Sequence, residues 1–127
     1  MIVAGVGFRR ETSSDEIERV VRMALGIFDL PVERLEAVAT ESERATDAAF
    51  VEAVRRLSAK LIGCTADDLD RVAGRVLTPS KLVLQAKGLP SIAEASALAA
   101  AGHAARLLGT RVATERATCA IAIGEGR

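Results

Sequence analysis

The chain has 127 residues, a length that predicts a single domain (residues 1–127) with an ordinary hydrophobic core. Half of the residues are apolar and 27% are charged, which excludes a disordered chain, and no apolar run is long enough to cross a membrane. Lys plus Arg and Asp plus Glu both number 17, and the only aromatic residues are three Phe. We therefore expect no nucleic-acid partner, because neither a basic field nor base-stacking aromatics are available.

The two cysteines, Cys64 and Cys119, lie far apart in apolar segments, outside any CxxC or Cys/His cluster. This pattern predicts two buried thiols, no metal site and no bound cofactor. The sequence begins with a strand and without a basic segment followed by an apolar one. We therefore expect a cytoplasmic protein with no membrane partner.

The first half of the chain alternates predicted strands with predicted helices. Residues 2–6 are a continuous apolar run, typical of a buried strand that ends at a glycine. A capping box of Ser13 and Glu16 opens a helix that ends at residues 29–31. The elements that follow are a strand over 35–40, a polar loop over 41–47 and a helix ending near Lys60.

The second half is predicted with one ambiguous segment. Residues 61–64 form a third strand, and Thr65 with Asp68 caps a brief helix. Residues 76–87 fit either a short helix, which we favour, or a strand. A turn over 88–91 is followed by a helix over 92–101, which begins with a capping box of Ser91 and Glu94 and ends at Gly102. Two strands follow, over 106–108 (or as far as 113) and over 117–123. The tail over 124–127 is expected to fray.

This order of elements predicts a fold class. Strands that alternate with helices favour parallel crossovers, and the last two strands have no helix between them, which favours an antiparallel pair. We therefore expect an α/β protein, a single three-layer α/β/α domain with a mixed, mostly parallel sheet.

The turn after the first strand is the leading candidate for a binding site. It combines two glycines, which have no side chain, with two adjacent arginines and the start of a helix, whose free N–H groups attract anions. The alternative is a tight turn with solvated arginines. The residues expected to bind ligand here and at two further helix starts are Gly5, Gly7, Arg9, Arg10, Thr12, Ser13, Thr40, Arg44, Asp47, Ser91 and Glu94.

Several other chemistries fit the sequence poorly or have structural alternatives. Arg10 stands where a dinucleotide fingerprint needs its third glycine, and no P-loop motif is present. His103 follows a helix end, where a structural role is favoured. Glu94 serves either as a cap or at a cleft rim, and Arg44 with Asp47 forms either part of that rim or a surface ion pair.

Four motifs in order resemble a known family: Gly5–Ser13, Ala39–Thr40 with Arg44 following, Gly88–Ala95, and Thr118–Ala122. They are similar to the CobE proteins, which are equivalent to the carboxy-terminal domain of the CbiG proteins of cobalamin biosynthesis. The chain departs from that family at Phe8, where a small residue or cysteine is common, and at Arg44 and Asp47, where lysine and glutamate are usual. Chemistry specific to lysine at position 44 is thereby put in doubt, whereas anion pairing is not.

The resemblance implies a role in cobalamin biosynthesis. The first hypothesis is a carrier or accessory factor that binds the carboxylates of a precorrin or corrinoid, with other enzymes of the pathway as further partners. The alternative is a hydrolase of the cobalt-precorrin-5A type, which opens the ring-A lactone and releases acetaldehyde, with Glu94 as the candidate catalytic residue that activates water. A third hypothesis, from outside the resemblance, is a nucleotide-binding regulatory domain.

Overall fold

The computed structural model describes residues 1–77 and 91–126. Its strands are β1 (Ile2–Phe8), β2 (Leu35–Glu41), β3 (Lys60–Cys64), β4 (Arg106–Leu107), β5 (Val112–Ala113) and β6 (Ala117–Ile123). The α-helices of these residues are α1 (Ser14–Ile27), α2 (Ala48–Arg56), α3 (Ala66–Val72) and α5 (Ile92–Ala101), and short 3-10 turns occupy Val32–Arg34 and Ala73–Arg75. The two alternatives for residues 76–87 fall, from residue 78 onward, outside the described residues.

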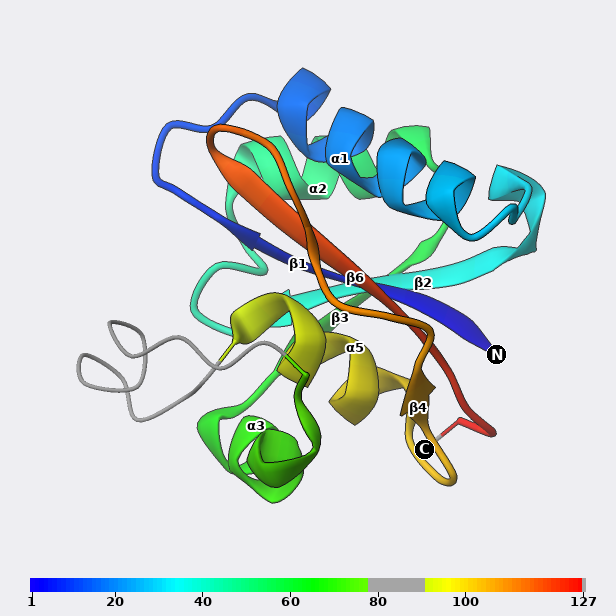
Figure 1. The fold of residues 1–127 in the computed structure, drawn as a ribbon. Helices are drawn as coiled ribbons and strands as arrows, with labels where there is room; N and C mark the ends of the chain where they lie inside the picture. The colour runs from blue at the N-terminus through cyan, green and yellow to red at the C-terminus, as the bar shows by residue number, and fades with distance from the viewer. Residues whose placement is uncertain (78–90, 127) are drawn as a thin grey trace.

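The strands form one mixed sheet in the order β3-β2-β1-β6-β4, with β5 also paired to β6 (Figure 1). β1, β2 and β3 are mutually parallel, and β6 pairs antiparallel with β1 along its whole length, from Ile2 opposite Ile123 to Phe8 opposite Ala117. β4 and β5 also pair antiparallel with β6, so among the described strands only β6 runs against the rest. The predicted mixed sheet with an antiparallel pair at the end of the chain is confirmed.

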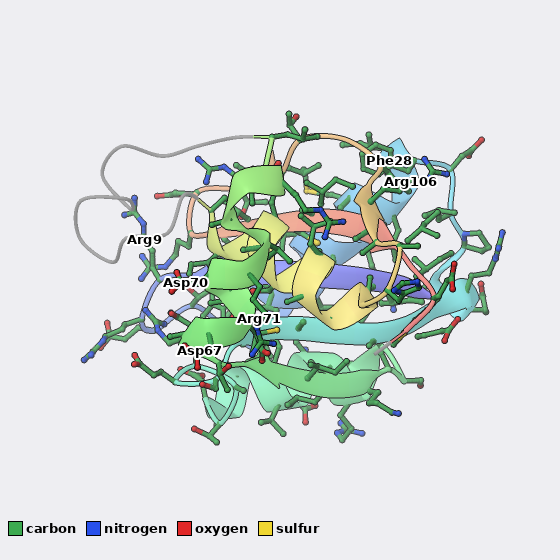
Figure 2. The ribbon with its side chains drawn as sticks, turned by 90° about the horizontal axis from the view of Figure 1, so that it is seen from below. Arg9, Phe28, Asp67, Asp70, Arg71 and Arg106 are labelled. Carbon is green, nitrogen blue, oxygen red and sulfur yellow. The ribbon has the colours of Figure 1, made fainter. Side chains whose placement is uncertain are left out.

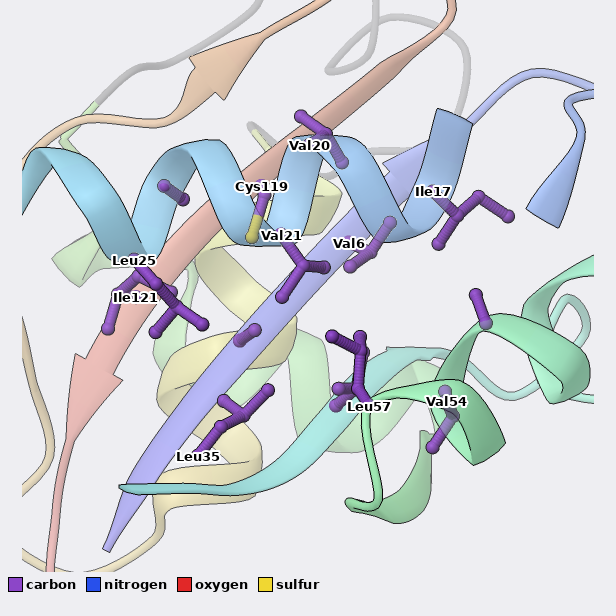
Figure 3. Packing of buried hydrophobic residues seen from close by; sticks show 14 of the residues in the cluster. Val6, Ile17, Val20, Val21, Leu25, Leu35, Val54, Leu57, Cys119 and Ile121 are labelled. Atoms are coloured by element: carbon purple, nitrogen blue, oxygen red, sulfur yellow. The ribbon is translucent and has the colours of Figure 1, made fainter. Parts of the chain in front are cut away.

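Helices cover both faces of this sheet, so the predicted three-layer architecture is confirmed. α1 and α2 lie on one face and α3 and α5 on the other (Figure 1). Valine, leucine and isoleucine side chains fill the space between the sheet and α1 and α2, among them Val6, Val21 and Ile121 (Figure 3). The core on the other face is built mainly from alanines, and these small side chains let α5 lie close to the strands.

Two predicted boundaries were wrong. The helix expected to reach Lys60 ends at Arg56, because Ser58 adopts a left-handed backbone (φ 55°) and turns the chain into β3. The tail expected to fray is held over residues 124–126, where Gly124 N–H donates to the carbonyl of Met1 (3.0 Å) and Gly126 N–H to that of Ala101 (2.8 Å). These contacts join the two ends of the chain and are invisible to any local pattern.

The predicted helix starts are confirmed. Ser13 and Ser91 cap α1 and α5 by accepting from the N–H groups of Glu16 (3.2 Å) and Glu94 (3.3 Å). Thr65 and Asp68 form the full reciprocal capping box of α3. Within the described ranges, none of the helices is long and apolar enough to cross a membrane.

Candidate anion-binding site

The candidate site lies at one end of the sheet, where β1 and β2 end and β6 begins. The pairing of Phe8 with Ala117 places the last residue of β1 beside the first residue of β6. The strand order also changes direction here, because the chain moves from β1 outward to β2 and β3 and then returns to the other side of β1. In open α/β sheets, ligands bind at such a reversal, outside the carboxyl ends of the strands.

A hollow of about 320 Å³ occupies this position. Its walls come from the end of β1 (Gly7, Phe8), the first residue of α5 (Ile92), and the turn between β5 and β6 together with the start of β6 (Thr114 to Thr118). Arg9 and Arg111 complete the lining. Three segments far apart in the sequence therefore build one concave surface beside a helix N-terminus.

Three arginines line the hollow and give it positive charge: Arg9, Arg111 and Arg116. None of them forms an ion pair with a carboxylate of the described residues, although Glu115 belongs to the same lining. Arg56, on the surface formed by α1 and α2, is by contrast paired with Asp15 (2.6 Å) and Glu52 (2.9 Å). The hollow therefore keeps guanidinium donors that suit carboxylates and phosphates.

The arginine turn is fastened to the β5–β6 turn by a set of hydrogen bonds. Arg9 N–H donates to the carbonyl of Arg116 (3.0 Å), and Arg116 Nη2 donates back to the carbonyl of Arg10 (3.0 Å). Thr12 Oγ1 donates to the carbonyl of Arg9 (2.6 Å) and closes the turn from inside. These bonds fix the backbone from which Arg9 and Arg10 project and hold the Arg116 guanidinium in place.

Of the residues predicted to bind ligand, Gly7 and Arg9 line the hollow. Arg10 is exposed and is not part of this lining. Its neighbour Arg9 lies at one edge of the molecule in Figure 2. Gly5 lies deeper and is not part of the lining. A side chain at Gly5 would meet the carbonyl of Ala93 at 2.0 Å, so this glycine permits the close approach of α5 to β1.

Five other predicted site residues make structural hydrogen bonds through their side chains. Thr12 closes the arginine turn, and Ser13 and Ser91 cap helices, as described above. Thr40 is buried and its Oγ1 donates to the carbonyl of Val6 (2.7 Å), which ties β2 to β1. Asp47 caps α2 by accepting from the N–H of Ala49 (3.0 Å). These contacts account for the polar side chains without a ligand.

Arg44 lies on the other side of Phe8 from the hollow. Its Cζ is 5.1 Å from the centroid of the Phe8 ring, within the range of a cation–π contact. Phe8 in turn stacks on Phe50, with 5.7 Å between ring centroids. The surface ion pair considered between Arg44 and Asp47 is replaced by a pair with Glu41, at 4.0 Å.

Glu94 and His103 occupy contrasting places. Glu94 is completely buried in the first turn of α5 and is not part of the lining of the hollow. His103 is exposed just beyond α5, where its N–H and carbonyl bond Gly126 (3.0 Å) and Glu125 (2.8 Å). These bonds involve only the backbone of His103, so the structural role predicted for its imidazole stays a prediction.

The sequence interpretation missed the contribution of the β5–β6 turn. Arg111, Arg116 and Thr118 were not among the residues predicted to bind ligand, although Thr118 begins one of the four family motifs. The spacing of two arginines around a short hairpin was the available signal, but only the antiparallel pairing of β6 with β1 places them beside Arg9.

The cysteines and other metal-ligand types do not assemble into a site. Cys64 and Cys119 are both buried and unbridged, as predicted, and burial raises the pKa of the Cys119 thiol. Across residues 1–77 and 91–126, no three His, Cys, Asp or Glu side chains gather closely enough to hold a metal ion.

The fold is that of an α/β domain with an arginine-lined hollow at the reversal point of its sheet. The model of the family described as cobalamin synthesis G C-terminus matches residues 2–122. The chain therefore belongs to this family, and with it to the proteins of cobalamin biosynthesis.

Individual relatives agree with this assignment. A protein CobE from Sinorhizobium sp is 29% identical over 121 residues, which cover 95% of this chain and 79% of that protein. The crystal structure of CobE, a protein from the cobalamin (vitamin B12) biosynthetic pathway, superposes with a TM-score of 0.91 at 27% identity, covering 100% of this chain and 92% of the other. The cobalamin biosynthesis protein chiG from Agrobacterium tumefaciens gives a TM-score of 0.78 at 37% identity, covering 98% and 99% of the two chains.

Proposed function

We propose that this protein binds a precorrin or related corrinoid intermediate of cobalamin biosynthesis through the carboxylates of that ligand, as a carrier or accessory factor. The observation that carries the proposal is the hollow at the end of β1, where Arg9, Arg111 and Arg116 converge without carboxylate partners in the described part of the chain. A precorrin bears acetate and propionate arms around an apolar ring. Guanidinium groups pair with such carboxylates, bidentately where the geometry allows.

The size of the hollow indicates how such a ligand binds. Its volume of about 320 Å³ is at the lower end of small-molecule pockets, which run from roughly 300 to 1,000 Å³. It therefore accommodates an acidic arm and the adjoining edge of a ring rather than a whole macrocycle. The ring then lies across the mouth of the hollow, with Phe8 and Ile92 as apolar contacts.

The burial of Glu94 favours binding without chemistry. A general base must reach both water and the reacting carbonyl, within about 3 Å of the proton that it removes. Glu94 has no exposed surface, so a lactone and a water molecule reach it only after a rearrangement. A hydrolase that opens the lactone is accordingly the alternative, and the experiment below separates the two.

The test incubates the protein with a lactone-bearing precorrin. Gel filtration with absorbance detection measures the complex, and an alcohol dehydrogenase assay measures free acetaldehyde. We expect a complex that elutes with the protein and no acetaldehyde above the protein-free background. Acetaldehyde that disappears in a Glu94→Gln variant would establish the hydrolase instead.

A second measurement addresses the nucleotide-binding alternative. Thermal unfolding is followed with precorrin and, separately, with ATP or GTP at millimolar concentration. A ligand that binds only the folded state raises the melting temperature. Stabilisation by precorrin alone supports the proposal, whereas stabilisation by nucleotide alone, with no precorrin complex in gel filtration, would overturn it.

A further inference from the structure

Two guanidinium nitrogens of the described residues are buried without a hydrogen-bond partner: Nη1 of Arg44 and Nε of Arg116. Buried donors without an acceptor are rare in native proteins, because such a donor loses its hydrogen bond to water and forms no replacement within the protein. Both of these donors lie beside the last residue of β1, Phe8. Their occurrence at the same end of the sheet calls for a common explanation.

In the hollow beside α5, the Arg116 guanidinium is held in place by one hydrogen bond while another of its donors has no acceptor. Its Nη2 bonds the carbonyl of Arg10, which leaves the Nε donor of the same guanidinium without an acceptor. Arg9 and Arg111 share this hollow and add positive charge around it. A carboxylate with two oxygens is the natural acceptor for such a guanidinium edge.

On the α2 side of Phe8, Arg44 is in an equivalent state. Its guanidinium lies over the Phe8 ring, and its contact with Glu41, at 4.0 Å, is at the outer limit of an ion pair. Nη1 has no acceptor among the described residues. The Arg44 side chain is 25% exposed, so part of it can be reached from solvent.

Phe8 separates the two arginines. Its ring contacts Arg44, stacks on Phe50 and packs against the core beneath α1 and α2, and Phe8 is also one of the residues that line the hollow containing Arg116. The end of β1 therefore has two incompletely bonded guanidinium groups beside the same apolar residue, one over its ring and one in the hollow that it helps to line. This arrangement is complementary to an apolar body that carries an acidic arm at each of two edges.

We propose that the site contains two carboxylate subsites, one at Arg116 and one at Arg44, with Phe8 between them. The inference rests on the proposed function and narrows the ligand class: a ring with at least two free acidic arms is required, and one carboxylate does not suffice. Arg116, which the sequence interpretation had passed over, becomes a determinant of affinity. Arg44 contributes as a charge donor to the ligand as well as to Phe8.

The experiment uses uroporphyrin I, an octacarboxylic porphyrin, as the probe, with binding followed by its fluorescence. The variants are Arg116→Gln, Arg44→Gln and the double variant. Arg106→Gln is the control for loss of a positive charge, because Arg106 is exposed and lies at the far end of the sheet from Arg9 (Figure 2). Each single variant should weaken binding about tenfold, as expected for one charge-assisted contact. Separate subsites predict that the losses multiply, giving about a hundredfold in the double variant.

The outcomes distinguish this inference from the proposed function. If wild-type protein does not bind uroporphyrin, precorrin or other acidic tetrapyrroles, both are overturned. If wild type binds and Arg9→Ala weakens binding, but either glutamine variant binds like wild type, the proposed function stands and the two-subsite inference fails. If the double variant binds uroporphyrin as tightly as the single variant with the lower affinity, both arginines bind the same carboxylate. That result would also overturn the inference.

Stability must be controlled at Arg116, because that residue also fastens the arginine turn. Melting temperatures of all variants are compared, and Arg116→Lys is used if the glutamine variant does not fold. Lysine keeps the charge and can still reach the Arg10 carbonyl, but it lacks a planar fork. It should retain the fold and lose at least about threefold in affinity. Unchanged affinity in that variant would contradict the subsite at Arg116.

Discussion

Gly5 of β1 lies directly against the backbone of Ala93 in α5. A methyl group at Gly5 would come within 2.0 Å of the Ala93 carbonyl oxygen and 2.5 Å of the Ala97 nitrogen. Both obstacles are backbone atoms of a buried helix, so they cannot move aside as a flexible side chain would. This close approach fixes the distance between α5 and the sheet, and with it one wall of the hollow.

Gly5→Ala should therefore lower the free energy of unfolding by about 3 kcal/mol, at the upper end of overpacking effects. Gly26→Ala in α1 is the matched control, because a Cβ at Gly26 meets nothing within 4 Å. That change should raise stability by about 0.5–1 kcal/mol through helix propensity. Chemical denaturation measures both, and a neutral Gly5→Ala would contradict the contact.

Arg9→Ala should weaken binding of an acidic tetrapyrrole without unfolding the protein. The side chain of Arg9 is exposed and lines the hollow, whereas its backbone N–H, which bonds the Arg116 carbonyl, is kept in alanine. We expect about a tenfold loss of affinity for uroporphyrin and a nearly unchanged melting temperature. Arg106→Ala should change neither quantity. A large fall in melting temperature for Arg9→Ala would make Arg9 a structural residue.

Thr40→Val tests whether a predicted site residue acts through structure. The hydroxyl of Thr40 donates to the carbonyl of Val6 at 2.7 Å in the buried sheet, and valine preserves the shape while removing that bond. Stability should fall by about 1 kcal/mol, with tetrapyrrole affinity within twofold of wild type. Thr110→Val, at an exposed position, controls for the substitution itself. Loss of affinity without loss of stability would return Thr40 to the binding site.

Glu52 predicts a specific acid response on the α1–α2 surface. Hydrogen bonds from Arg55 and Arg56 lower the pKa of Glu52 from 4.5 to about 2. A carboxyl whose pKa is lower in the folded state adds stability above its ordinary pKa and loses that contribution as pH falls toward the folded value. The contribution should therefore decline between pH 4.5 and about 2. Because the site is solvent-exposed, the effect should be small.

NMR titration of the side-chain carboxyl carbon of Glu52 measures the pKa of this group directly. The difference in stability between wild type and Glu52→Gln should shrink over the same pH interval and be reduced by high salt. A titration midpoint near 4.5 would show that the two arginines do not hold the carboxylate in solution.

The two thiols should be inert in the native protein. Cys64 and Cys119 have no exposed surface, and burial raises the pKa of Cys119, so little thiolate forms and reagent cannot reach it. Ellman's reagent at pH 8 should release no colour from folded protein and two equivalents after denaturation in guanidinium. Rapid reaction of one equivalent under native conditions would reveal a local opening at that cysteine.

Local sequence patterns were enough to predict most of the strands and helices and the fold class. Apolar runs at 2–6 and 117–123, the helix over 92–101 and the caps at Ser13, Thr65 and Ser91 were all predicted where the structure has them. These features depend on interactions between residues a few positions apart, which a linear pattern records. The sequence-based boundaries were wrong in two places. At Ser58 a single backbone conformation ends the helix, and at residues 124–126 the chain contacts distant segments.

Which arginines line the same hollow depends on contacts between distant segments of the folded chain. The sequence pointed to Arg9 as an anion ligand, but the pairing of β6 with β1 brings Arg111 and Arg116 to it across more than a hundred residues of chain. The tertiary contacts also account for Thr40, Asp47 and Ser91 through hydrogen bonds within the fold. The type of a residue and its local spacing indicate that it carries a charge or caps a helix. Whether that group faces a ligand or a backbone partner depends on what packs against it, and packing is a property of the folded chain.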